Sequence, residues 1–451
     1  MKAFYTGIVL LFVCAFNVSA QDITGKWYGN VDMGGMKLRI IFSIAQSGEG
    51  YTGFLLSPDQ SSQEIPADII TWKDNQLTMT ITQLAFSYKG TLKEDETLEG
   101  AISQMGATFP AILSRKPFEV NRPQEPRPPY PYKEEEVTFQ NSGAGIKLSG
   151  TLTLPNGNGT FPAVILVTGS GSQNRDEEMM GHKPFLVIAD YLTRRGIAVL
   201  RYDDRGVGRS EGDFEKAFIS DFADDAAAAI AFLKSRKEID PKKTGAIGHS
   251  EGGAVVTLLA AKQIPSFIIT LAGVGVAGRE VLRSQREAIF KASGAQQNYI
   301  DSYNATMAKA EDMLLAASNF DQADMEQQLK TLFAQTPLAG QEKTVLKQLS
   351  MPVFRSLLLF DPAVCFKEIR CPVLALNGAK DLQVVPSLNL EGFRKITTNG
   401  NKQVTVREYP GLNHLFQTTA TGLPTEYNQL EETFSPTVMK DISEWILRTS
   451  E

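Results

Sequence analysis

The stretch that decides the fold is Thr244-Gly-Ala-Ile-Gly-His-Ser-Glu-Gly-Gly253. It opens with a short apolar run typical of a strand, and the Ala, Val and Leu residues that follow it predict a helix. Between the two lies Gly-x-Ser-x-Gly with Ser250 at its centre, in the strand–turn–helix setting that this motif requires. Serine on so sharp a turn has a strained backbone, and side chains at the flanking glycines would collide with neighbouring elements. The stretch therefore predicts a nucleophilic serine at the end of a strand.

Strands and helices alternate on both sides of this turn. Apolar strands are predicted at residues 146–154, 163–168, 197–202, 244–248, 267–271, 372–377 and 403–409. Amphipathic helices are predicted between several of them, notably at 182–195 and 218–236. Continuous apolar strands interleaved with helices indicate an α/β fold with a largely parallel sheet covered on both faces.

One interval breaks the alternation. About a hundred residues separate the strand that ends near 271 from the strand that starts at 372, far more than an ordinary connection. Its middle, residues 281–349, is helix-rich and poor in β-branched runs. We expect a helical cap at about 278–350, inserted over the carboxyl edge of the sheet, where open α/β folds bind ligands.

The first part of the chain follows a different pattern. Within residues 21–116, short β-like runs at 37–42, 51–55, 77–81 and 108–113 alternate with turns, which predicts a small antiparallel barrel or sandwich. The Gly-x-Trp sequence around Trp27 resembles the opening of lipocalin-like barrels, and we interpret Trp27 as a packing residue. This domain is a candidate for contact with the substrate or with a second protomer. Six prolines between 117 and 131 predict a semi-rigid linker, 117–133, before a second domain, 134–451.

The first twenty residues predict a secretory signal peptide. Lys2 precedes the apolar run 7–16, and small residues follow up to Ala20, near which we expect cleavage. We therefore expect an exported protein, periplasmic or extracellular after cleavage. The apolar run is too short to span a bilayer and no later stretch is long enough, so no membrane insertion is expected.

Charge and cysteine content narrow the classes of partner. The formal net charge is -6, and removal of Lys2 changes it to -7, which argues against nucleic acid as a partner. The chain has three cysteines, of which Cys14 lies in the predicted signal peptide, so no disulfide framework is expected. Cysteine and histidine do not cluster, so a structural zinc site has no ligands.

A serine nucleophile needs a base, and the chain has three histidines. His249 adjoins Ser250 and should point away from it, while His182 lies upstream near the start of a predicted helix. His414 follows the last predicted strand, as the order serine, carboxylate, histidine demands. We therefore predict His414 as the general base.

The third member of a triad is a carboxylate that holds the imidazole in the correct tautomer. Asp381 stands in the loop directly after the strand 372–377, whereas its nearest rival, Asp361, lies before that strand. Acyl transfer also needs backbone N–H donors for the oxyanion. We expect one from Glu251 and the other from the glycine-rich turn at 168–172, supplied by Ser170 or Gly169. A phosphate-binding loop would need a lysine, which this turn lacks.

Taken together, residues 137–450 resemble a bacterial α/β-hydrolase carboxylesterase with a Gly-His-Ser-Glu-Gly-Gly elbow, near the dienelactone hydrolases. The matching motifs are Thr168-Gly-Ser-Gly-Ser-Gln-Asn-Arg-Asp176, Arg201-Tyr-Asp-Asp-Arg-Gly-Val-Gly-Arg-Ser210, Gly248-His-Ser-Glu-Gly-Gly253, Asn377-Gly-Ala-Lys-Asp381 and Asn413-His414. The resemblance implies a mostly parallel eight-stranded sheet, and a turn at 203–206 that braces loops around the site.

Two departures from the family bear on chemistry. Thr168 stands where many relatives have histidine, which alters the oxyanion loop without removing its backbone donors. Dienelactone hydrolases use a cysteine nucleophile, so Ser250 indicates ordinary ester substrates. The expected reaction is cleavage of a small-molecule carboxylic ester through an acyl-enzyme, with no metal or organic cofactor.

Other functions share these residues. A thioesterase, a peptidase or an acyltransferase would use the same triad. A protein of another class, in which the first domain binds a glycan or lipid and the hydrolase half is an inert scaffold, is the further alternative.

Overall fold

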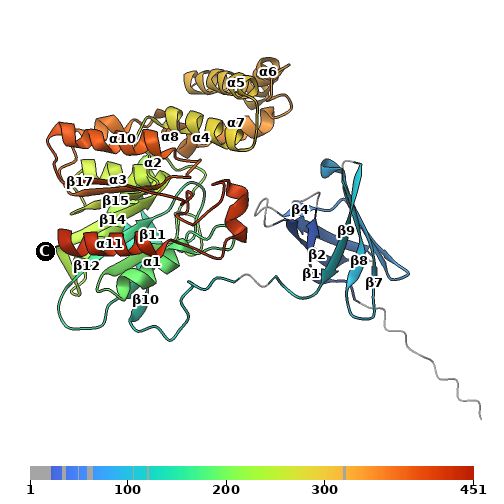
Figure 1. Ribbon diagram of the computed structural model, residues 1–451, viewed down its shortest axis with the longest axis horizontal. Helices are drawn as coiled ribbons and strands as arrows, with labels where there is room; N and C mark the ends of the chain where they lie inside the picture. Colours follow the sequence, from blue (N-terminus) through green and yellow to red (C-terminus); the bar gives the residue numbers. More distant parts are fainter. Residues whose placement is uncertain are drawn as a thin grey trace, which may run out of the picture. The chain divides into compact units, whose positions relative to one another are not determined.

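The computed structural model describes residues 22–32, 37–48, 50–57, 64–104, 106–118, 121–317 and 321–450 (Figure 1). The predicted signal peptide, residues 1–20, lies outside them. The chain divides into two compact units, Met1–Glu119 and Val120–Glu451, at a boundary inside the proline-rich segment. None of the helices in the described ranges is both long enough and apolar enough to cross a bilayer.

The first unit is an antiparallel β domain. Its described strands form one sheet in the order β4-β3-β2-β1-β9-β8-β7-β6-β5. The strands are β1 (Gly25–Asp32), β2 (Lys37–Ser47), β3 (Gly50–Leu56), β4 (Ile65–Pro66), β5 (Ile69–Lys73), β6 (Gln76–Ile81), β7 (Phe86–Leu92), β8 (Leu98–Gln104) and β9 (Ala107–Ser114). A single continuous sheet differs from the two stacked sheets of a sandwich, which was one of the two expected architectures.

The β domain encloses its own apolar core. Alternate residues of β6, Leu77, Met79 and Ile81, are fully buried, as the period-two pattern predicts. Trp27 is also buried, and its indole N–H donates to the Ile23 carbonyl at 2.9 Å. Trp27 is therefore a packing residue. A Cβ added at Gly53 would lie 2.9 Å from the Ile70 side chain, so β3 and β5 approach each other as the sheet curls.

The second unit is built on an eight-stranded sheet in the order β10-β11-β13-β12-β14-β15-β16-β17. The strands are β10 (Lys133–Asn141), β11 (Ile146–Leu154), β12 (Phe161–Val167), β13 (Ala198–Tyr202), β14 (Ile239–His249), β15 (Ile268–Leu271), β16 (Val373–Gly378) and β17 (Val404–Tyr409). The pairs β10–β11 and β11–β13 are antiparallel and the others are parallel. The sheet is therefore mostly parallel.

Helices cover both faces of this sheet. They are α1 (Pro184–Thr193), α2 (Ile219–Ser235), α3 (Glu251–Ala261), α10 (Pro386–Arg394) and α11 (Pro436–Thr449). Figure 1 shows α1 and α11 on one side of the sheet and α2 and α3 on the other. Strand residues such as Ala246, Ile247 and Ile269 are consequently fully buried.

The long interval between β15 and β16 is helical. It contains α4 (Gly278–Ala292), α5 (Gln297–Ala316), α6 (Gln322–Phe333), α7 (Glu342–Ser350), α8 (Pro352–Leu359) and α9 (Pro362–Phe366). In Figure 1 the helices α4 to α8 lie together beyond one edge of the sheet. They have an apolar cluster of their own, which includes Leu314, Leu329, Phe333 and Leu349. The helical insertion runs beyond the expected end at 350, as far as Phe366.

Candidate active site

Ser250 occupies a sharp turn between β14 and α3. Its φ is 52° and its ψ is −116°, in the region that residues other than glycine rarely adopt. The Ser250 N–H donates to the Leu271 carbonyl at 2.8 Å. A Cβ on Gly248 would lie 2.1 Å from the Gly252 carbonyl oxygen, and one on Gly252 would lie 2.4 Å from the Val167 carbonyl oxygen. Both flanking glycines are therefore required by close backbone contacts.

His414 and Asp381 are joined by a buried hydrogen bond. His414 Nδ1 lies 2.8 Å from Asp381 Oδ2, and both side chains are almost fully buried. The other carboxylate oxygen of Asp381 accepts the N–H groups of Gln383 and Val384, at 2.8 and 2.9 Å. Ser250 and His414 line the same cavity of about 350 Å³. The structure thus brings all three predicted triad residues to one site.

His182 and Asp361, the other candidates for the base and the carboxylate of the triad, lie elsewhere. His182 is buried away from this cavity, where its ring nitrogens bond to Thr433 and to the Tyr427 carbonyl. Asp361, the rival carboxylate, accepts the Ala363 N–H at 2.9 Å as the N-cap of α9. His182 therefore bonds to the segment that contains Tyr427 and Thr433, and Asp361 caps the start of α9.

His249 supports the site through both ring nitrogens. Nδ1 lies 2.8 Å from Glu177 Oε1, and Nε2 donates to the His414 carbonyl at 3.1 Å. The His249 and His414 ring centroids are 4.8 Å apart. Burial alone would lower the pKa of His249, but the neighbouring Glu177 carboxylate and the hydrogen bonds raise it above the ordinary histidine value overall.

Glu177 is a residue of the site that the sequence did not reveal. The same oxygen that meets His249 accepts the Gly169 N–H at 2.7 Å, and the side chain is almost fully buried. Glu177 therefore links the glycine-rich turn to His249, which in turn bonds to the loop that carries His414. Only its place among the acidic residues 176–178 marked it in the sequence, and such short charged runs are normally solvated.

The two candidates for the oxyanion donor of the glycine-rich turn, Gly169 and Ser170, differ in their surroundings. Because the Gly169 N–H already donates to Glu177, Ser170 is the better placed of the two. Glu251 is the first residue of α3, so its N–H has no acceptor within the helix. The Ser170 hydroxyl donates to Glu251 Oε2 at 3.0 Å, which connects the two segments.

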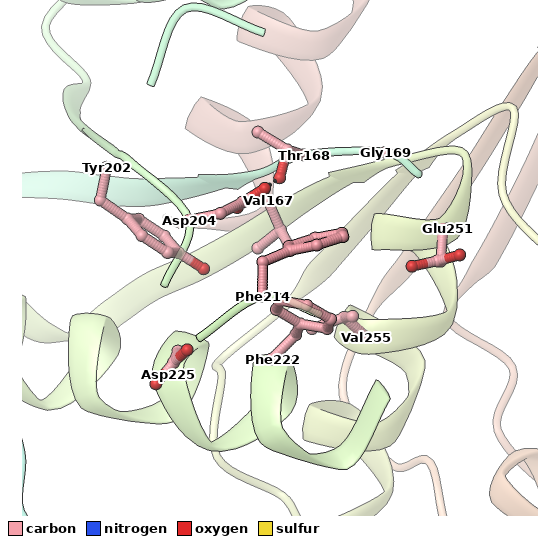
Figure 2. Close-up of a pocket in the computed structure, with 10 residues that line it drawn as sticks. All are labelled: Val167, Thr168, Gly169, Tyr202, Asp204, Phe214, Phe222, Asp225, Glu251 and Val255. Atoms are coloured by element: carbon pink, nitrogen blue, oxygen red, sulfur yellow. Dashed lines mark hydrogen bonds between the residues drawn. The ribbon is translucent and has the colours of Figure 1, made fainter. Parts of the chain in front are cut away.

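A small hollow lies behind this turn. It is lined by Asp204, Glu251, Asp225 and Tyr202 together with the rings of Phe214 and Phe222, as Figure 2 shows. Its volume of about 10 Å³ is room for roughly one water molecule.

Burial in this region raises the pKa of two carboxyl groups, those of Asp204 and Glu251. Desolvation raises the pKa of Asp204 to about 7, although Thr168 Oγ1 and the Gln173 N–H donate to the carboxylate at 2.7 and 2.9 Å. Desolvation likewise raises the pKa of Glu251 to about 7, and the bond from Ser170 opposes that shift. Both carboxyls are therefore easily protonated near neutral pH.

The turn at 203–206 braces these loops, as the family resemblance implied. Asp203 accepts two bonds from the Arg175 guanidinium, at 3.1 and 2.7 Å. Arg205 pairs with Asp225 at 2.7 Å, and Arg201 pairs with Asp176. Arg175 is thus bonded to the turn at 203–206, and Asp176 is bonded to strand β13.

The cavity in front of Ser250 is mainly apolar. Residues of the helical insertion and of neighbouring loops supply its apolar walls: Met179, Phe214, Val274, Val281, Leu282, Met351, Val353, Phe354, Leu357 and Val384. The polar part of the lining consists of three amides, from Gln285, Gln348 and Gln383, and of the site residues Ser170, His249, Ser250, Glu251 and His414. Its volume is at the lower end of the range of about 300–1,000 Å³ for small-molecule sites.

Fold and site together define a hydrolase of the α/β class, a serine hydrolase of ester or peptide bonds. The family model described as X-Pro dipeptidyl-peptidase (S15 family) matches residues 103–411. The chain belongs to this family.

Individual relatives match with lower identity. Esterase EstD of Thermotoga maritima is 25% identical over 321 residues, which cover 71% of this chain and 69% of that protein. The thiohydrolase aneE of Aspergillus aculeatus is 36% identical over 119 residues, which cover 24% of this chain and 32% of that protein. Among solved structures, Est1E from Butyrivibrio proteoclasticus with ferulic acid bound has a TM-score of 0.42 and 18% identity, covering 70% of this chain and 99% of that chain.

Proposed function

We propose that this protein hydrolyses carboxylic esters through an acyl-enzyme, with Ser250 as nucleophile, His414 as general base and Asp381 as its partner. One observation carries the proposal. Ser250, on its strained turn, lines the same cavity as His414, and Nδ1 of that imidazole is 2.8 Å from Asp381. A base whose other nitrogen is held by a buried carboxylate is arranged to take a proton from a hydroxyl.

The reaction proceeds in two steps. Ser250 Oγ attacks the ester carbonyl while His414 removes its proton, and the oxyanion is received by the N–H groups of Glu251 and Ser170. His414 then gives the proton to the leaving alcohol, and the C–O bond breaks to leave an acyl-serine. Water attacks that ester by the same route in reverse, releasing the acid and restoring the serine hydroxyl.

The cavity lining favours an ester over a peptide from which a dipeptide would be released. In a peptide that is cleaved after its second residue, the protonated amino terminus lies close to the scissile bond. The enzyme would need a free carboxylate in the cavity to bind this amine. Among the described residues that line the cavity, Glu251 carries the sole carboxyl group, and it already accepts the Ser170 hydroxyl. The apolar walls suit a neutral acyl group, and the name of the EstD relative agrees with this choice.

Replacement of the nucleophile tests the proposal. We expect Ser250→Ala to lower kcat for p-nitrophenyl butyrate by about 10³-fold or more, because the acyl-enzyme cannot form. Circular dichroism and thermal unfolding provide the control for folding. Turnover near the wild-type level in this variant would refute the mechanism.

Two further measurements separate the alternatives. Stoichiometric labelling of Ser250 by a fluorophosphonate excludes an inert scaffold that serves a glycan- or lipid-binding domain. Hydrolysis of Ala-Pro-p-nitroanilide with a higher kcat/KM than that of p-nitrophenyl butyrate would assign the site to peptides instead.

A further inference from the structure

We propose that the Glu251 side chain is a positioning residue that ties together the two halves of the oxyanion hole. Its backbone N–H is one of the two donors, and its carboxyl group holds the residue that supplies the other, Ser170. The inference rests on the proposed function, since it concerns how that site stabilises the oxyanion.

The hydrogen bond between the two segments is the first support. Glu251 begins α3, while Ser170 belongs to the turn after β12, and the two residues are 81 positions apart in the chain. The Ser170 Oγ to Glu251 Oε2 distance is 3.0 Å. Because the hydroxyl and the N–H belong to the same residue, holding the hydroxyl also limits the rotation of that backbone.

The second support is the location of the Glu251 carboxyl group. Glu251 lines both the cavity in front of Ser250 and the small hollow behind the turn, so it forms part of the wall between them. Figure 2 shows the carboxyl on α3 in a setting that also contains Phe214, Phe222 and Val255. An acid among such neighbours lowers stability relative to an apolar residue of similar size. Packing alone therefore does not account for glutamate at this position, whereas its bond to Ser170 does.

A second carboxylate holds the adjacent residue of the turn. Glu177 accepts the Gly169 N–H at 2.7 Å, so two consecutive residues of the turn are each anchored by a buried acid. The Glu177 carboxylate binds the backbone N–H of Gly169, and the Glu251 carboxyl group binds the hydroxyl of Ser170. Because the Gly169 N–H and the Ser170 side chain are both held, the Ser170 N–H has a defined direction, as an oxyanion donor requires.

The test compares Glu251→Met, Glu251→Gln, Ser170→Ala and the double variant S170A/E251M with p-nitrophenyl butyrate. Methionine preserves length and helix propensity but accepts no bond from Ser170, whereas glutamine keeps an acceptor oxygen. We expect E251M to lower kcat by about 10- to 100-fold, below the loss for complete removal of a donor, with KM changed by less than about 3-fold. E251Q should retain kcat within about 3-fold, and S170A/E251M should be no slower than the slower single variant.

A boronic acid that forms a tetrahedral adduct with Ser250 gives an independent readout. Its Ki should rise in E251M by the same factor as kcat falls, because adduct and transition state use the same donors. Thermal unfolding checks that each variant folds.

The outcomes distinguish this inference from the proposed function. If Ser250→Ala abolishes turnover while E251M retains wild-type kcat, or if the losses in S170A and E251M multiply in the double variant, the positioning role is refuted and the esterase mechanism stands. If Ser250→Ala remains active, the mechanism fails and the inference fails with it.

Discussion

The side chain of Asp381 is oriented by hydrogen bonds within its own loop. One carboxylate oxygen accepts the Gln383 and Val384 N–H groups, which leaves the other oxygen for His414. Its position after a strand, in the order serine, carboxylate, histidine, was sufficient to predict it. Glu177 has no such local signature, because its two partners, His249 and the Gly169 N–H, come from other segments.

The buried acid at 251 also predicts a pH effect on stability. In the unfolded chain Glu251 has its ordinary pKa of 4.5, and desolvation in the fold raises the pKa to about 7. Between these values the folded protein holds a proton that the unfolded chain has released, so this group makes stability fall as pH rises. The fall in stability ends about one pH unit above the folded-state pKa, where Glu251 is ionised in both states.

Glu251→Gln does not titrate and should remove this dependence. We expect the free energy of unfolding of E251Q, relative to the wild type, to increase from pH 5 to pH 8 by up to about 3 kcal/mol. Urea unfolding at both pH values measures the change. Asp204, whose pKa is also raised, is present in both proteins, and the Glu251 charge is the last of the causes that raise it, so loss of that charge in E251Q changes the difference in the same direction. A difference that is constant across this range would contradict the prediction.

Among the elements, the helices of the insertion shape the substrate cavity. The first turn of α4 packs closely on α8, since a Cβ on Gly278 would lie 1.8 Å from the Leu357 carbonyl oxygen. Val281 and Leu282 from α4 and Phe354 from α8 then meet in the cavity lining. The length of the interval and its helix-rich composition predicted the insertion, but its cavity-facing residues were not predictable because they depend on how the helices pack.

The cavity should therefore control acyl-chain preference through α8. Phe354→Ala enlarges the cavity, so we expect the ratio of kcat/KM for octanoyl over butyryl p-nitrophenyl esters to rise by about tenfold. Leu359→Ala is the matched control, because Leu359 lies on the same helix, is 69% exposed and does not line the cavity. An equal ratio in the two variants would place the acyl group elsewhere.

Of the two edge strands of the eight-stranded sheet, β17 was predicted and β10 was not. The apolar strand β11 was predicted with its observed bounds, whereas β10 was not, because it opens with Lys133-Glu-Glu-Glu136. An edge strand pairs on one side only and tolerates charged residues, so it lacks the continuous apolar pattern of a buried strand. The central strands of the parallel sheet carry that pattern and were all predicted.

At the scale of the whole molecule, each of the two units has an apolar core of its own. One core fills the β domain, the other lies around the eight-stranded sheet, and a smaller apolar cluster lies within the helical insertion of the second unit. Loss of packing in one core should therefore affect the stability of that unit before it affects the chemistry of the other.

Leu77→Ala tests this independence. Leu77 is fully buried in the β domain, and its truncation should lower the stability of that unit by about 2–5 kcal/mol. We expect a calorimetric transition to shift while kcat for p-nitrophenyl butyrate remains unchanged at 25 °C. A parallel loss of turnover would instead assign the β domain a part in the reaction.

The sequence alone determined the features that depend on neighbouring residues and on chain order: the serine turn, the strand–helix alternation, and the positions of Asp381 and His414. The tertiary structure decided the features that depend on distant residues. Glu177 meets His249 across 72 positions, and Ser170 meets Glu251 across 81. Local propensity and periodicity carry no information about such pairs, because burial and hydrogen-bond partners arise only when the sheet and its loops have assembled.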